Sequence, residues 1–209
     1  MNPRFLVYLS LLFVVLIYAA INYKHLSLSF KLLNLLILIT LMSESMTWSG
    51  PFSIQNPLIL YHILLPLTML ILWFISRNLT SSIHKINFVI TVTFILLSIS
   101  NSIWYQNDVF PSHGVSLLCN LGVWLALGIF KDIILLPSKI KITKRAEFWF
   151  AVFSLIFYST TFFTFTFYNF FSKSYWLQDF SFYSNFILYP GYCIAFYFDI
   201  NRNKYTYEH

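Results

Sequence analysis

Long apolar runs separated by short polar segments recur along the whole chain, and this pattern predicts its fold. An α-helix rises ~1.5 Å per residue and a bilayer has a hydrocarbon core of ~30 Å, so about 20 apolar residues cross it. We therefore expect an all-α polytopic membrane protein, in which residues 1–209 form a single domain that is a bundle of seven transmembrane helices. The expected spans are about 5–21, 30–48, 57–76, 86–105, 115–136, 148–168 and 180–198.

Composition supports the same class. Hydrophobic residues make up 58% of the 209 residues, charged residues make up 10%, and the mean hydropathy is +0.71. A soluble domain of this length does not carry such a composition. Cys119 and Cys193 both lie inside apolar runs, so the sequence supports neither a disulfide framework nor a thiolate metal site.

Lysine and arginine gather in alternate loops, which predicts the orientation of the chain. Only Arg4 and Lys173 fall on one side, and cytoplasmic loops are the ones enriched in basic residues. We therefore expect the N-terminus outside and the C-terminus in the cytoplasm. Because the net charge of +6 is held in these loops, it indicates the lipid bilayer as a partner and no nucleic acid. The eleven residues on the expected cytoplasmic side are Lys24, Lys31, Arg77, Lys85, Lys131, Lys139, Lys141, Lys144, Arg145, Arg202 and Lys204.

The first apolar run also has the look of a signal peptide that would end near Ala20. Cleavage there would place Lys24 and Lys31 outside, against the preference of the later loops. An uncleaved first helix is the more consistent interpretation.

The third run, residues 56–76, carries a histidine within an apolar helix. A 3.6-residue repeat places His62 on the same face as Met69 and Trp73, so this face is expected to look into the protein. An ionisable group inside a membrane is costly unless it is paired or wet. The nearest partner along the chain is Glu44, which the expected orientation places at a similar depth near the outer surface.

Other strong hydrogen-bonding groups also fall in the expected outer half of the bundle. The cytoplasmic half is aliphatic and aromatic, with no comparable carboxylate, imidazole or amide row except Asn34. This asymmetry predicts a pocket that opens outward and is closed inward. Each group also suits a plain interhelical hydrogen bond, and Glu44 also suits a water-exposed helix end. The expected ligand-binding residues are Glu44, Tyr61, His62, Asn101, Asn120 and Asn185.

The sequence lacks the residues that several kinds of membrane-protein chemistry require. A retinal protein needs a lysine in its last helix, and residues 180–198 contain none. A metal-dependent hydrolase would have to use Glu44, His62, Asp108 and His113, which show no HExxH-type spacing. No GxSxG motif or phosphate-binding glycine loop is present. The sequence therefore assigns no catalytic residue, metal or cofactor, and it favours a protein that is not an enzyme while leaving the hydrolase as an alternative.

A small-solute transporter is a further alternative. Seven helices suit two parallel three-helix repeats joined by the fourth helix, which is the arrangement of the SWEET sugar carriers. Trp48 and Tyr61 recur as Trp176 and Tyr189 at one separation of 128 residues, but the match extends no further than short apolar stretches.

Three stretches resemble a group of small bacterial seven-helix membrane proteins, most of them uncharacterised. They are Glu44, NPLILYHILLP at Asn56–Pro66 and NSIWYQ at Asn101–Gln106. The resemblance implies a seven-span fold in a bacterial inner membrane and carries no established activity.

These patterns lead to one functional hypothesis. We expect a receptor-like or sensor-like protein that binds a small apolar or amphipathic ligand, or a lipid, in the outward-facing pocket. Ligand binding would shift helices whose inner ends carry the basic loop Pro137–Arg145. That loop is expected to meet anionic lipid headgroups or a cytoplasmic protein partner.

Overall fold

The computed structural model describes residues 3–48, 57–80, 84–106, 110–135, 140–166, 175–202 and 204. Asn56, Asp108, Lys139 and Lys173, on which parts of the sequence interpretation depend, lie outside these residues.

The described part of the chain is helical and contains no strand, which confirms the predicted all-α class. Short connections join the helices, two of them containing a single 3-10 turn, η1 (Tyr23–His25) and η3 (Ile142–Lys144). The seven helices are α1 (Pro3–Ile21), α2 (Leu28–Trp48), α3 (Pro57–Leu79), α4 (His84–Trp104), α5 (Ser112–Leu135), α6 (Ala146–Thr166) and α7 (Tyr175–Ile200).

Six of the helices, α1 to α6, are long and apolar enough to cross a membrane. Large apolar side chains such as Val14, Ile63 and Leu96 are exposed on their outer surfaces, as expected of helices in contact with lipid. Length and composition therefore make this a multi-pass membrane protein. Helix α7 is not among the six within the described residues.

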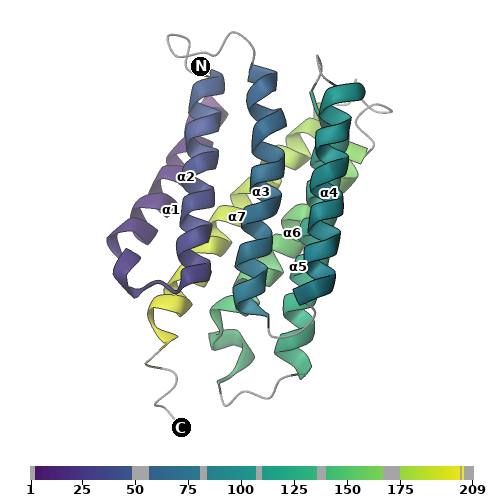
Figure 1. The fold of residues 1–209 in the computed structure, drawn as a ribbon. Helices are drawn as coiled ribbons and strands as arrows, with labels where there is room; N and C mark the ends of the chain where they lie inside the picture. Colours follow the sequence, from purple (N-terminus) through teal and green to yellow (C-terminus); the bar gives the residue numbers. More distant parts are fainter. Residues whose placement is uncertain are drawn as a thin grey trace.

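Six of the helices form a closed ring, and α4 lies outside it. In chain order around the ring, α1 packs on α2, α2 on α3, α3 on α5, α5 on α6, and α6 on α7, which returns to α1. Helix α4 packs against α3 and α5 from outside the ring (Figure 1). Successive helices run in opposite directions, so α1 begins at one end of the bundle and α7 finishes at the other (Figure 1). We call these the N-terminal end and the C-terminal end.

The C-terminal half of the ring is filled by apolar side chains. Phe30 lies on α2 with its ring centroid 5.9 Å from that of Phe196 on α7, in an edge-to-face arrangement. Such packing leaves little space between these side chains, although a crevice of about 670 Å³ opens at the C-terminal end beside Phe30. The most deeply buried side chains here are Phe30, Leu33, Met69, Ile75, Leu121, Ile129 and Phe196.

This half contains more buried polar groups than Asn34, which the sequence interpretation considered alone. Asn87 and Asp132 are only 4% and 5% exposed. The amide oxygen of Asn87 accepts a hydrogen bond of 2.9 Å from the indole of Trp124, which joins α4 to α5. Polar groups of this kind hold helices together inside a membrane.

At the C-terminal end, an acidic residue joins the start of α2 to the end of α7. The Oδ2 atom of Asp199, at the end of α7, accepts a hydrogen bond of 2.7 Å from the backbone N–H of Ser27. Ser27 directly precedes α2, whose first N–H groups have no partner within the helix. The carboxylate therefore satisfies a helix start and fixes α2 beside the far end of α7.

Close packing between α5 and α6 depends on a glycine. A Cβ atom built on Gly122 would lie 2.3 Å from Cδ2 of Tyr158, which is closer than any stable contact. The phenol ring of Tyr158 therefore lies directly against the backbone of α5. Gly128, two turns further along α5, has no such neighbour, since its added Cβ would approach only Nδ2 of Asn87, at 4.0 Å.

We expect Gly122→Ala to destabilise the protein by about 1–3 kcal/mol, because the methyl group has to push the buried ring of Tyr158 away from the backbone of α5. Gly128→Ala is the matched control on the same helix. It is expected to be neutral or to stabilise by up to about 1 kcal/mol, because alanine is the better helix former. Thermal unfolding of both variants in detergent measures the difference, and equal melting temperatures would contradict the packing described for Tyr158.

Candidate functional site

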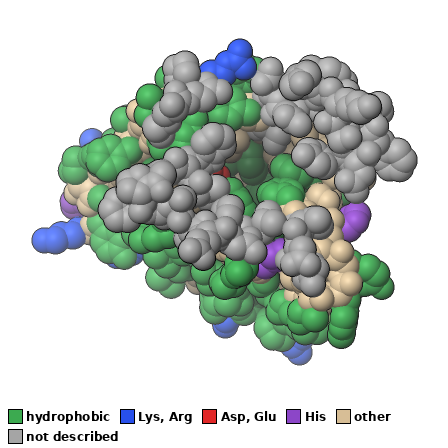
Figure 2. All heavy atoms as spheres, turned by 90° about the horizontal axis from the view of Figure 1, so that it is seen from above, with side chains coloured by type: hydrophobic (Ala, Val, Ile, Leu, Met, Phe, Trp, Pro, Cys, Tyr) green, Lys and Arg blue, Asp and Glu red, His purple; other side chains and the backbone are tan. Residues whose placement is uncertain are grey.

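A cavity of about 280 Å³ lies between the six ring helices, in the half of the bundle nearest the N-terminal end. Every ring helix contributes to its wall and α4 contributes none. Figure 2, which looks onto this end, shows a hollow between the helices with an acidic side chain inside it. Among the described residues of the cavity wall, Glu44 on α2 is the one acidic residue.

The cavity receives a stripe of side chains from each of α2, α3, α5, α6 and α7, and Tyr8 from α1. On α3 the lining residues Tyr61, Leu65 and Thr68 follow one another at helical spacing, and on α7 Asn185 and Tyr189 do the same. Residues three or four apart point to the same side of a helix, so each stripe is a consequence of local sequence. The closed ring turns these stripes toward a common centre.

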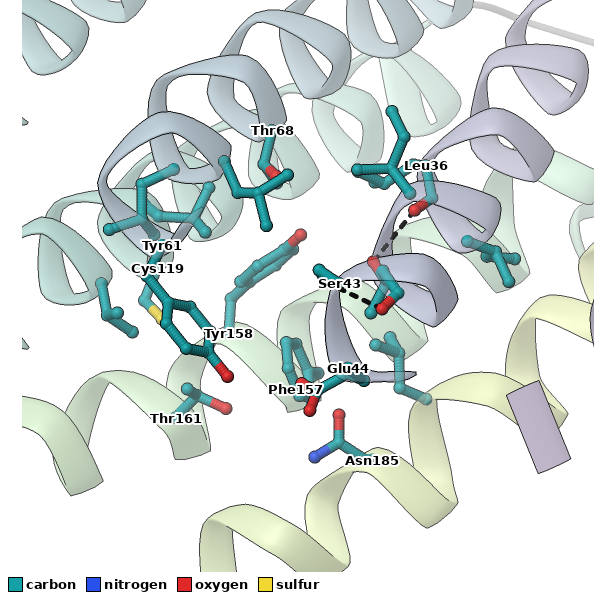
Figure 3. Close-up of a pocket in the computed structure, with 18 of the residues that line it drawn as sticks. Leu36, Ser43, Glu44, Tyr61, Thr68, Cys119, Phe157, Tyr158, Thr161 and Asn185 are labelled. Atoms are coloured by element: carbon teal, nitrogen blue, oxygen red, sulfur yellow. Dashed lines mark hydrogen bonds between the residues drawn. The ribbon is translucent and has the colours of Figure 1, made fainter. Parts of the chain in front are cut away.

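Glu44 and Asn185 point toward one another from α2 and α7 (Figure 3). Glu44 is also close enough to Tyr8 and Tyr189 to interact electrostatically with both phenols. Among the described residues, none donates a hydrogen bond to the Glu44 carboxylate, and the cavity wall contains no lysine, arginine or histidine. Glu44 is therefore the acidic group of the described wall and has no basic partner there.

Small hydroxyl groups complete the polar lining. The hydroxyls of Thr40 and Ser43 on α2 donate hydrogen bonds to backbone carbonyl oxygens of their own helix, at 2.9 and 2.8 Å (dashed in Figure 3). Thr161 on α6 differs, since its buried hydroxyl has no hydrogen-bond partner among the described residues. A buried hydroxyl without a partner costs about 1–3 kcal/mol, so a ligand or water that met it would recover that cost.

Aromatic rings and aliphatic side chains share the remaining wall. Phe110, which precedes α5, has its ring centroid 5.5 Å from that of Tyr61 and 5.5 Å from that of Phe165 on α6. On the α1 and α7 side, the ring centroids of Tyr8 and Tyr189 are 6.0 Å apart. The described wall thus combines aromatic and aliphatic side chains with one carboxyl group and a few neutral polar groups.

The structure brings three of the six sequence-predicted residues together in the cavity wall and separates the other three from it. Glu44, Tyr61 and Asn185 line the cavity. His62 follows Tyr61 in sequence, and adjacent residues on a helix point about 100° apart, so His62 is directed to the α4 side of α3. There its Nδ1 atom is hydrogen-bonded to Oγ of Ser102 on α4, at 2.8 Å. Ser102 thus takes the place that the sequence interpretation gave to Glu44 as the partner of His62.

The two remaining amides take part in helix contacts. Asn101, on α4, is buried and donates a hydrogen bond of 2.8 Å to Oε1 of Gln106. Gln106 in turn donates to Oγ of Ser112 at the start of α5, at 3.0 Å, so the pair joins the end of α4 to the start of α5. Asn120 is exposed and donates to the carbonyl oxygen of Ser116 on its own helix. Neither amide belongs to the cavity wall.

The sequence interpretation did not name the polar lining residues of α6. Its buried residues include Ser154, Tyr158 and Thr161, spaced four and three residues apart within a phenylalanine-rich helix. This polar stripe was a usable signal, because the spacing marks one helix face.

The described residues contain no group of three His, Cys, Asp or Glu side chains that could hold a metal ion. His113, one of the ligands considered for a hydrolase, is exposed at the start of α5, and Asp108 lies outside the described residues.

No protein-family model, curated protein or solved structure matches this chain. Function has to be argued from the cavity and its chemistry.

We expect the His62–Ser102 hydrogen bond to stabilise the α3–α4 contact by about 0.6 kcal/mol, the average of such bonds inside membranes. A double-mutant cycle with His62→Ala and Ser102→Ala, followed by unfolding in micelles, measures this coupling energy. A coupling energy of zero would show that the two side chains do not interact.

Proposed function

We propose that the protein is a receptor-like or sensor-like membrane protein that binds a small apolar or amphipathic molecule in the six-helix cavity. The observation that carries this proposal is the asymmetry of the ring. One half encloses a cavity lined by Glu44, Asn185 and apolar side chains, whereas the interior of the other half is packed with apolar side chains and a crevice with charged walls opens at its end. A concave, mostly apolar site with a few convergent polar groups is the usual form of a small-molecule site.

The distribution of basic residues supports an orientation with the cavity outside. Of the thirteen lysines and arginines, the sequence assigns eleven to the loops, the tail and the adjoining helix ends of one side, and the basic side of a membrane protein faces the cytoplasm. We propose that α7 crosses the membrane as the seventh span, because it packs along α1 and α6 within the ring. The ligand then enters from the extracytoplasmic side of a bacterial inner membrane.

A sensor also needs a way to report that its site is filled. Glu44 and Asn185 face one another from α2 and α7, and the same two helices meet at the C-terminal end through Ser27 and Asp199. A ligand that bridges Glu44 and Asn185 biases the relative position of the two helices. The hydrogen bond between Ser27 and Asp199 borders a crevice lined by Lys144, Arg145 and Arg202. An anionic lipid or a cytoplasmic partner bound there would respond to the shift.

We expect a compound that binds the cavity to raise the melting temperature of the purified protein, because it binds only the folded state. A concentration of about 100 times its Kd adds about 2.7 kcal/mol of stability. The variants Glu44→Gln and Asn185→Leu are expected to lose most of this stabilisation. Asn120→Ala, an exposed residue outside the wall, is the control and is expected to retain it. A compound that stabilises all of these variants as strongly as the parent binds elsewhere.

The orientation is tested with reporters fused after His209. A reporter that is active only in the cytoplasm is expected to be active, and a reporter that works only outside the cytoplasm is expected to be silent. The reverse result would place the cavity on the cytoplasmic side and overturn the outward-facing site.

A transporter is the second candidate, and the position of α4 favours it. Because α4 lies outside the ring, the cavity is enclosed by two consecutive sets of three helices, α1 to α3 and α5 to α7. Carriers built from two parallel three-helix repeats joined by a linking helix enclose their substrate in this way. Uptake of a cavity-binding compound into proteoliposomes separates the two functions, since a receptor binds the compound without moving it.

A further inference from the structure

We propose that the ligand of the cavity is a small organic cation, such as an amine or a quaternary ammonium compound. This inference rests on the proposed ligand-binding function and names its chemical class. It is carried by the juxtaposition of one carboxylate, a surrounding set of aromatic rings and the lack of basic residues in the described wall.

The charge of the wall discriminates between ligand classes. Glu44 faces the cavity, and no lysine, arginine or histidine belongs to the described residues that line it. A charge held inside a membrane protein is costly without an opposite charge, so an anionic ligand is repelled. A neutral ligand leaves the carboxylate unpaired, whereas a cation supplies the missing counter-charge.

The rings of the wall suit the same class. A cation is attracted to the face of an aromatic ring, and the attraction strengthens when water is excluded. Tyr61, Phe110 and Phe165 form a continuous series on one side of the cavity, and Tyr8 and Tyr189 form a pair on the other. Enclosure by rings on both sides is how proteins recognise quaternary ammonium groups.

A neutral polar end of the same ligand would find partners at the α6 and α7 side. The amide of Asn185 and the hydroxyl of Thr161 are both directed to this region of the site (Figure 3). The Thr161 hydroxyl has no hydrogen-bond partner among the described residues, so it is available to a hydroxyl or amino group of the ligand. The site therefore fits a cation that also carries one hydrogen-bonding group.

The test compares compounds of the same shape that differ in charge. Choline and 3,3-dimethylbutan-1-ol are isosteres in which a positively charged nitrogen replaces a carbon atom, and 3,3-dimethylbutanoate supplies a negative charge. Benzyltrimethylammonium and neopentylbenzene form a larger pair. Each compound is titrated into the purified full-length protein at constant ionic strength, with sodium chloride as the salt control. Thermal stabilisation and calorimetric binding are the readouts.

We expect the cation of at least one pair to bind about tenfold or more tightly than its neutral isostere, and the anion not to bind. Glu44→Gln is expected to abolish the preference for the cation. Tyr61→Leu keeps the carboxylate and is expected to weaken the cation more than the neutral isostere, which provides a second test if Glu44→Gln does not fold. Asn120→Ala is expected to bind like the parent protein.

The outcomes separate this inference from the function on which it rests. Equal binding of cation and isostere, or binding of neutral compounds alone, overturns the cation assignment and leaves a ligand-binding cavity. Preference for the cation that survives in both Glu44→Gln and Tyr61→Leu places the compound elsewhere and also overturns the assignment. If no compound in the panel binds, the cation assignment is rejected. If a wider set of small amphipathic compounds also fails to bind, the ligand-binding function is rejected with it.

Discussion

The structure depends on one constraint, that polar groups inside a bilayer have to be satisfied within the protein. Lipid offers them neither hydrogen bonds nor charge, so a polar side chain that does not bond to its own helix, as Asn120 does, turns to another helix or to an enclosed cavity. This chain does both. Asn87 bonds to Trp124 and His62 to Ser102 across helix contacts, whereas Glu44 and Asn185 face a cavity. The two destinations separate side chains that stabilise the bundle from side chains available to a ligand.

Helix α4 shows the first destination. Its buried residues are Asn87, Thr91, Ser98 and Asn101, and its large apolar side chains face outward. On a soluble protein, a surface helix turns its polar side chains to water and its apolar side chains to the core. The arrangement on α4 is the opposite because the surrounding solvent is lipid. Because α4 seals the outer side of the α3–α5 contact, its polar groups contribute to helix packing, and the cavity is left to the other six helices.

The acids show the difference most clearly. Asp199 accepts a hydrogen bond from the backbone N–H of Ser27, and its Oδ1 atom lies 3.9 Å from Nη1 of Arg202. Its charge is therefore compensated where two helices meet. Glu44 lies in a cavity without a basic residue in its described wall, beside the rings that enclose it. A protein that satisfies one acid and leaves another open to a cavity has a site in which a cation would complete the electrostatics.

The sequence by itself determined the helices, because the length and hydrophobicity of each apolar run are local properties and the bilayer fixes the length that a span requires. It also identified Glu44, Tyr61 and Asn185, whose positions follow from helical spacing and a common depth. Only the tertiary structure decided which helices are neighbours, because a polar face does not specify its partner. The exclusion of α4 from the ring separated Asn101 from the cavity, and the rotation of α3 directed Tyr61 inward and His62 to Ser102. Adjacent residues on one helix thereby acquired different roles, since the angle between them is fixed locally but the surface each one meets depends on the packing of the whole bundle.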